Sequence, residues 1–193
     1  NSFFGKMLIG MEYIFFRKGP MTMGASQLCG FAKSDPSRDT PNLQFHIQPI
    51  STDELGGSNL HDFNAFTPTV ANIRPTSRGE VYIDSADSRD NPKIKMNYLS
   101  TPEDRKVTAD GLKLIRKIVL ETNAFAKYEP EEFRPGINIQ EDEELVKAAS
   151  DHAQTIFHPV GTCKMGNDEN AVVNDRLVAH GLKNLRIVDA SIM

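Results

Sequence analysis

The stretch Leu43-Gln-Phe-His-Ile-Gln48 alternates apolar and polar side chains along its whole length. A period of two is typical of a β-strand with one buried face and one polar face. His46 lies on the polar face, where solvent exposure explains most histidines. The stretch therefore predicts a strand of a sheet, and it makes His46 a substrate-binding candidate if the polar face borders a cavity.

Two further segments, residues 80–84 and 93–98, alternate in the same way and are predicted to be half-buried strands. The segment between them, 85–92, is rich in turn-forming residues, which favours an antiparallel pair. Residues 51–69 are rich in Gly, Ser, Asn, Asp and Thr, so we expect a long irregular connection there.

Three segments are predicted to be helices. Apolar residues recur at helical spacing over residues 2–18, and we expect this stripe to pack in the core rather than to lie on a membrane. Thr101-Pro-Glu-Asp104 is a helix start signal, and a buried stripe continues it at Val107, Gly111, Leu114 and Ile118. The acidic residues 141–144 are interpreted as the first turn of a third helix, ending near Ile156 or Phe157, rather than as a calcium site. Together these elements predict an α+β domain with a mostly antiparallel sheet and flanking helices.

Composition excludes several classes of function. With 193 residues and 39% hydrophobic content, the chain can bury the core of one domain. The net charge of -4 arises from interspersed charges, so we expect no nucleic-acid partner, and no membrane association is indicated. The two cysteines do not form a disulfide framework, which favours a reducing, cytoplasmic location.

A candidate for chemistry is His158-Pro-Val-Gly-Thr-Cys-Lys-Met-Gly166. Pro159 breaks the preceding helix, and the two glycines permit close approach of a planar ligand, so the imidazole can lie in a cleft. The alternative is that His158 only caps the helix before it. A second block, Asn184-Leu-Arg-Ile-Val-Asp-Ala-Ser-Ile-Met193, is predicted to be a short buried strand that delivers Asp189 and Ala190 to a turn, where a ligand can bind.

These blocks, with Arg74-Pro-Thr-Ser-Arg-Gly79 and Thr101-Pro-Glu-Asp104, resemble the glucose-methanol-choline (GMC) oxidoreductases, specifically the C-terminal half of the choline and alcohol dehydrogenase branch. The resemblance implies the GMC substrate-binding domain of an enzyme that binds FAD and oxidises alcohols by hydride transfer. It divides the chain into an entry segment (1–73), the C-terminal substrate-binding domain (74–173) and a segment returning toward the FAD-binding domain (174–193). The Gly-rich dinucleotide fingerprint is absent from the sequence, so we expect the N-terminal Rossmann-type FAD-binding unit to be missing and the chain alone to be inactive.

The resemblance also implies roles for particular residues. His158 matches the base that takes the alcohol proton, Asp189 and Ala190 match residues near FAD, and His46 matches a position that faces substrate in some members. A second catalytic His or Asn is expected beyond Met193. The implied partner is a small alcohol, with a quinone, oxygen or another carrier as electron acceptor.

Two other functions are open on the sequence. One is a GMC-fold lyase acting on a cyanohydrin, which keeps the flavin without redox chemistry. The other is a binding domain that has lost the chemistry. A metal enzyme is least favoured, because none of the five histidines has a short ligand spacing to cysteine or acid.

Overall fold

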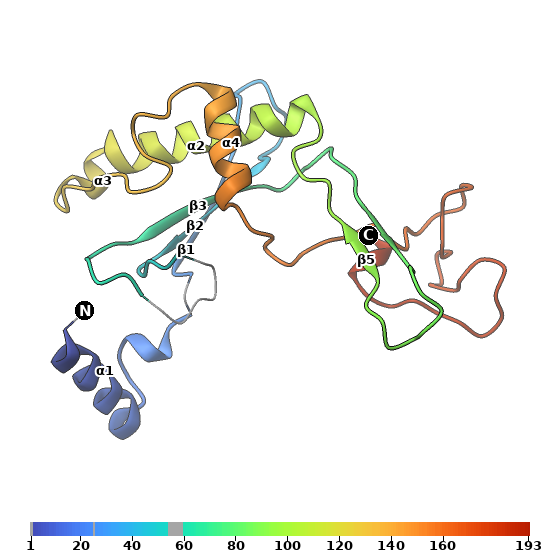
Figure 1. Ribbon diagram of the computed structural model, residues 1–193, viewed down its shortest axis with the longest axis horizontal. Helices are drawn as coiled ribbons and strands as arrows, with labels where there is room; N and C mark the ends of the chain where they lie inside the picture. The colour runs from blue at the N-terminus through green and yellow to red at the C-terminus, as the bar shows by residue number, and fades with distance from the viewer. Residues whose placement is uncertain (1, 25, 54–59) are drawn as a thin grey trace. The chain divides into compact units, whose positions relative to one another are not determined.

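The computed structural model describes residues 2–24, 26–53 and 60–193 (Figure 1). Two compact units are formed, each from two separate stretches of sequence: Asn1–Thr76 with Leu99–His152, and Ser77–Tyr98 with Ala153–Met193. The elements in chain order are α1 (Phe3–Phe16), η1 (Pro20–Thr22), β1 (Leu28–Ala32), β2 (Leu43–Gln48), β3 (Thr67–Asn72), β4 (Glu80–Tyr82), β5 (Lys93–Lys95), α2 (Pro102–Leu120), α3 (Asn123–Ala126), α4 (Asp142–His152) and η2 (Ala190–Ile192). The α+β class with antiparallel sheets is confirmed. The roles assigned to residues 1–73, 74–173 and 174–193 stay a prediction.

The first unit contains an antiparallel sheet in the order β1-β2-β3. The strand at 43–48 is confirmed, and its neighbours β1 and β3 were not predicted. β3 begins at Thr67, inside the stretch predicted to be irregular, and residues 54–59 of that stretch lie outside the described residues. Pro68 makes β3 resemble a loop in sequence, but an edge strand tolerates proline because one side of it needs no ladder hydrogen bond.

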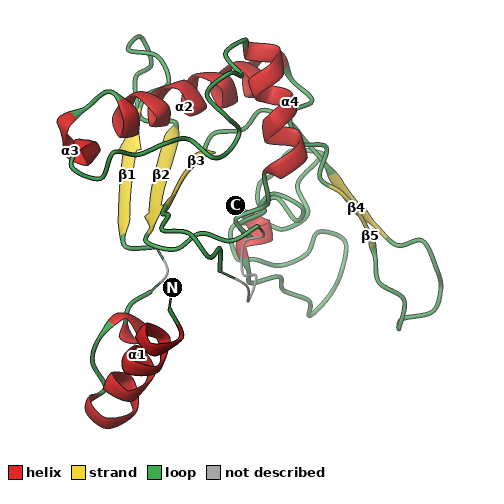
Figure 2. Cartoon of the chain, turned by 60° about the vertical axis from the view of Figure 1, so that its left-hand side comes forward, coloured by secondary structure: helices red, strands yellow, loops and turns green. Residues whose placement is uncertain are grey.

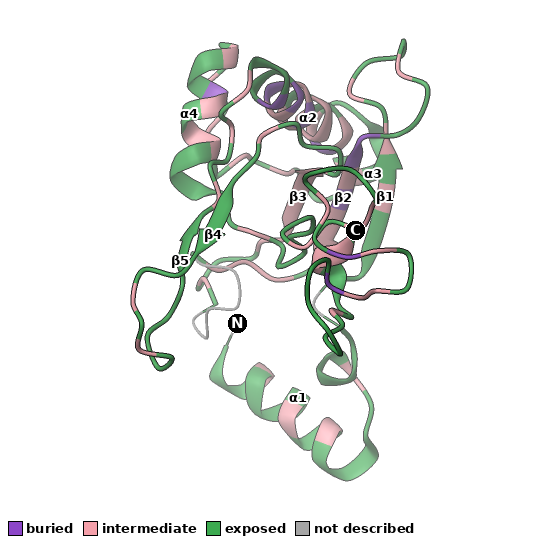
Figure 3. Ribbon diagram, turned by 90° about the vertical axis from the view of Figure 1, so that its right-hand side faces the viewer, coloured by how far each residue is buried: buried purple, intermediate pink, exposed green. Residues whose placement is uncertain are grey.

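The core of this unit lies between β2 and α2. Leu43 and Phe45 pack against Val107, with Val70 and Leu114 at the margin. Figure 2 shows α2 lying across one face of the three strands, and Figure 3 shows buried residues in both α2 and β2. The predicted apolar stripe of this helix is therefore confirmed at Val107 and Gly111.

The start of α2 is fixed by its cap. The Thr101 hydroxyl accepts a hydrogen bond from the Asp104 N–H at 3.2 Å, as the start signal predicts. The Asp104 carboxylate is buried and accepts hydrogen bonds from the Thr76 N–H at 2.8 Å and from Asn72 at 3.3 Å. It thereby joins the end of β3 to the first turn of α2.

Replacing Thr101 with alanine is expected to destabilise the fold by about 1 kcal/mol, because the cap acceptor is removed from the helix N-terminus. Thr101→Ser keeps the hydroxyl and should retain most of that stability. Chemical unfolding of the two variants beside the parent protein measures the difference. Equal losses in both variants would contradict a capping role.

The third predicted helix is confirmed as α4, with Asp142, Glu143 and Glu144 in its first turn and Leu145 fully buried. Its predicted end near Ile156 or Phe157 is wrong, since the helix ends at His152. Thr155 and Ile156, which follow the helix, are β-branched and have low helix propensity. Pro159 also disfavours a helical backbone at the residue that precedes it. Among the residues that the structure describes, no group of three or more His, Cys, Asp or Glu side chains could hold a metal ion.

The first predicted helix is also confirmed, but its predicted packing is wrong. The Ser2 hydroxyl caps α1 by accepting the Gly5 N–H at 3.1 Å, yet no residue of the helix is buried. Its apolar side chains are exposed, because among the described elements the short helix η1 alone makes more than slight contact with α1. None of the described helices combines the length and apolar character needed to cross a bilayer.

The second unit contains the β4–β5 ribbon, with Val81 paired to Ile94. The antiparallel pair is confirmed, but all residues of both strands are exposed, including Val81 at 48% and Ile94 at 63%, so neither strand has the buried face that was predicted. Gly79 directly precedes β4 and lies close to the backbone of Lys95. A Cβ at this position would be 2.2 Å from the Lys95 carbonyl oxygen, so this close approach of the two chain segments requires glycine.

The predicted buried strand over 184–193 is wrong. The segment has one isolated bridge, between Val178 and Arg186, followed by the short helix η2. Leu185 and Val188 are exposed. The Ile187 N–H donates to the Leu177 carbonyl, but the pairing does not continue along the segment as a regular ladder.

Candidate active site

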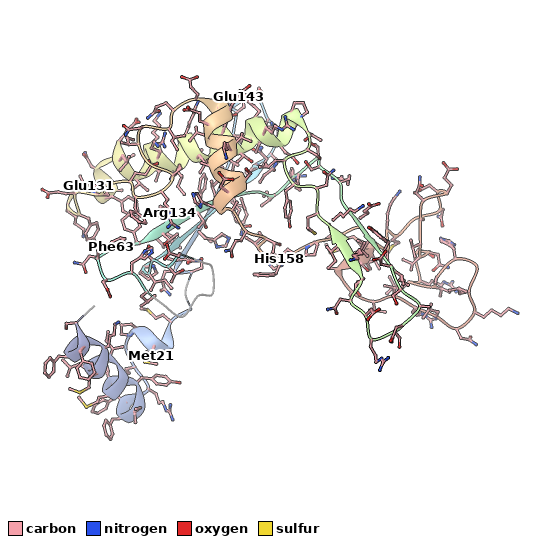
Figure 4. All side chains as sticks on the ribbon, in the orientation of Figure 1. Met21, Phe63, Glu131, Arg134, Glu143 and His158 are labelled. Atoms are coloured by element: carbon pink, nitrogen blue, oxygen red, sulfur yellow. The ribbon has the colours of Figure 1, made fainter. Side chains whose placement is uncertain are left out.

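His158 lies on the loop that follows α4 (Figure 4). Its side chain is exposed and makes no hydrogen bond or ion pair with the described residues. Phe157, just before it, has a φ of 62°, which turns the chain sharply ahead of the histidine. Because α4 ends six positions earlier, His158 does not cap that helix, and both imidazole nitrogens are available to a ligand.

The loop after His158 pairs with the end of the chain. The Cys163 N–H donates to the Ser191 carbonyl, and the Met165 N–H donates to the Ile192 carbonyl, each at 2.9 Å. Gly161, with a φ of 89°, lies beside Met193, whose carbonyl oxygen would be 3.7 Å from an added Cβ. The structure therefore brings together the two motifs that the sequence singles out.

Asp189 caps the turn that holds this pairing. Its carboxylate accepts hydrogen bonds from the Ser191 N–H at 2.8 Å and from the Ser191 hydroxyl. These two bonds, the hydroxyl bond first, hold the pKa of the Asp189 carboxyl below its ordinary value. Asp189 orders the 189–193 turn, which leaves the adjacent Ala190 exposed at the surface.

Replacing Ser191 with alanine should raise the pKa of Asp189 toward its ordinary value of 3.8, since the strongest of its hydrogen bonds is removed. The pKa of the folded carboxyl lies below that of the unfolded chain, so this hydrogen bonding stabilises the turn at neutral pH. The stabilisation is lost as pH falls through the folded pKa. An NMR titration of labelled aspartate measures the change. Asp168, whose pKa is lowered mainly by Lys164, is the control that should not move.

His46 lies in the other unit, on β2. Its Nδ1 is 2.9 Å from the Ser26 hydroxyl, and its side chain is half-buried. The structure thus groups His158, Asp189 and Ala190 in one unit, with His46 on the sheet of the other.

Sequence reasoning missed two partners in these sites. Ser26 orients His46 from twenty positions away in sequence. The His180 Nε2 contacts the Gly166 carbonyl at 3.0 Å and so braces the end of the His158 loop. Neither residue belongs to a local pattern, so only the folded chain reveals them.

The chain is similar to known proteins both in a family model and along its full length. Residues 75–193 match the family model for GMC oxidoreductase. The chain is 42% identical to an alcohol dehydrogenase [acceptor] of Pseudomonas putida over 193 residues, which cover 100% of the chain and 35% of that protein. It is also 42% identical to an oxygen-dependent choline dehydrogenase of Citrobacter koseri over 185 residues, 96% of the chain and 33% of that protein. The chain therefore spans about a third of the length of these curated relatives.

Solved structures give the same fold. A formate oxidase superposes with a TM-score of 0.85 at 22% identity, covering 100% of this chain and 38% of its own. Pyridoxine 4-oxidase from Mesorbium loti gives a TM-score of 0.72 at 27% identity, covering 87% of this chain and 33% of its own. With the family model matching more than half of its residues, the chain belongs to the GMC oxidoreductase family.

Proposed function

We propose that the full-length protein carrying this chain is an FAD-dependent alcohol oxidoreductase, and that the chain supplies its substrate-binding part and its catalytic base. The observation that carries the proposal is the exposed, unpartnered imidazole of His158 on a loop held against the 189–193 turn. The names of the relatives, alcohol dehydrogenase and choline dehydrogenase, support the same class of reaction.

The 189–193 turn has the features needed to contact a flavin. Ala190 is exposed, its side chain is a single methyl group, and its N–H donates to none of the described residues. An available backbone N–H beside a small side chain can donate to a carbonyl or phosphate oxygen of a bound cofactor. The Asp189 carboxylate is already hydrogen-bonded within the turn, so its role in FAD binding is to hold Ala190 in position.

His158 acts on the alcohol hydroxyl. A neutral imidazole nitrogen accepts the hydroxyl proton as the C–H bond breaks, and the developing alkoxide is a better hydride donor than the alcohol. Bound FAD supplies the acceptor for the hydride. The unpartnered nitrogens of His158 fit this role, because a histidine already committed to a structural hydrogen bond would have to break it first. The substrate-binding role of His46 is part of the same proposal.

Anaerobic mixing of the full-length protein with a panel of alcohols tests the reaction. Bleaching of the bound flavin on mixing is the expected result. A protein that holds flavin and cleaves a cyanohydrin without bleaching by any alcohol would be a lyase. A protein without flavin would be a binding domain, and either outcome overturns the proposal.

A further inference from the structure

The apolar core of the second unit is small. Of the described residues of this unit, only Val173 and Ala179 are buried, at 0% and 5% exposure. They pair in an antiparallel bridge, and Val173 also pairs with Met165 in a parallel bridge. A region with so few buried apolar contacts opens easily, so the hydrogen bonds between its segments determine how firmly each segment is held.

The 189–193 turn is held by the 163–166 segment. The N–H groups of Cys163 and Met165 donate to two carbonyls of the turn, each at 2.9 Å. No other segment of the described chain makes a backbone hydrogen bond to this turn. The position of the turn therefore depends on how firmly the 163–166 segment is fixed.

The 163–166 segment is fixed at its end by His180. The Gly166 N–H donates to the Val173 carbonyl at 3.0 Å, and the Gly166 carbonyl lies 3.0 Å from the Nε2 of His180. A carbonyl oxygen can only accept, so the Nε2 of His180 carries the proton and donates it. The backbone N–H of His180 donates at the same time to the Val172 carbonyl at 2.9 Å. One residue thus ties the 163–166 segment to the segment that follows it.

The ring of His180 makes this hydrogen bond whether it is neutral or charged. Nε2 holds a proton both in the imidazolium and in the neutral form that donates to Gly166. The residue is exposed, so replacing it with alanine removes the hydrogen bond without opening a cavity in the core. A variant at this position therefore reports on the hydrogen bond and not on packing.

Resting on the proposed function, we infer that His180 is a positioning residue for FAD. Its Nε2 fixes the 163–166 segment through Gly166, and this segment holds the turn that carries the available N–H of Ala190. His180 acts through this segment and is not required to touch the flavin. A donor that is already in place binds its ligand more tightly, because less of the site has to be ordered on binding.

Titration of FAD into the flavin-free full-length protein tests the inference. His180→Ala should weaken FAD binding by about tenfold, the upper end of the effect of one hydrogen bond. His180→Gln should restore most of the affinity, because the side-chain amide of glutamine also donates to a carbonyl. His152→Ala, which removes an exposed imidazole from the end of α4 in the first unit, should bind FAD as the parent protein does.

Hydrogen exchange of backbone amides gives a second readout, which does not depend on FAD. In the flavin-free protein, the Cys163 and Met165 amides should exchange about tenfold faster in His180→Ala and near the parent rate in His180→Gln. The Leu145 amide, which donates to the Glu141 carbonyl at the start of α4, is the control and should exchange at the parent rate in both variants.

The outcomes separate this inference from the proposed function. Unchanged FAD affinity in His180→Ala would overturn the inference, whether or not the two amides exchange faster. Weaker FAD binding that His180→Gln does not recover, or that comes without faster exchange, would also overturn it, because the hydrogen bond to Gly166 would not be the cause. Flavin that binds normally to the parent protein but is reduced by no alcohol would overturn the proposed function and leave the role of His180 intact. A parent protein that binds no FAD would overturn both.

Discussion

Flavin reduction by an alcohol is expected to slow by about 10² to 10⁴ when His158 is replaced with alanine in the full-length protein. This loss corresponds to roughly 3 to 5 kcal/mol of transition-state stabilisation. Since the imidazole is exposed and makes no hydrogen bond or ion pair with the described residues, its removal should leave the fold and the flavin content unchanged. Anaerobic stopped-flow absorbance of the flavin measures the rate.

Two comparisons separate a base from a structural residue. His152→Ala removes another exposed imidazole, that of the last residue of α4, and should leave the rate unchanged. Added imidazole should restore part of the rate in the His158 variant, because a small base can enter the space left by the side chain. Reduction as fast in His158→Ala as in the parent protein would refute the assignment.

Replacing Arg116 with methionine is expected to destabilise the first unit by about 3 to 5 kcal/mol. The guanidinium of Arg116 on α2 binds both carboxylate oxygens of Glu132, at 2.7 and 2.8 Å, and donates to the Ile139 carbonyl at 3.0 Å. The two side chains are 9% and 12% exposed, so the variant leaves a buried carboxylate without its counter-ion. Chemical unfolding of the full-length protein, followed by the loss of helical circular dichroism, measures the effect.

The same helix provides the control. Lys113, one turn earlier on α2, pairs with Asp142 at the surface, where both side chains are nearly half exposed. Lys113→Met should cost less than about 1 kcal/mol, because water solvates Asp142 once its partner is removed. Similar losses of unfolding free energy in both variants would show that the Arg116–Glu132 pair does not stabilise the packing of the 128–140 segment on α2.

The sequence predicts the elements whose signals are local. The alternation at Leu43–Gln48 and the cap at Thr101 depend on neighbouring residues, and the structure has both. β1 and β3 were missed because their short, mixed sequences become strands only through pairing with β2 on either side. Propensity over five or six residues carries little of that long-range information.

Burial was predicted less well than secondary structure. The α1 helix and the 184–193 segment were expected to be buried because they are apolar, and the structure leaves both exposed. The apolar content of a segment indicates how much surface it could bury. Whether that surface is buried depends on another part of the protein packing against it. The candidate site shows the same limit: both motifs were found in the sequence, but their pairing through Cys163 and Met165 is a property of the folded chain.

The interleaving of the two units constrains how the protein is made. A chain emerging from the ribosome exposes the β4–β5 ribbon before the second half of the first unit, Leu99–His152, has been synthesised. At the usual rate of protein synthesis, about 5 to 20 residues per second, several seconds pass between synthesis of the ribbon and synthesis of Ala153–Met193. During that interval the ribbon lacks the rest of its unit, and a premature stop after His152 would leave the second unit permanently without Ala153–Met193 while both stretches of the first unit had been synthesised.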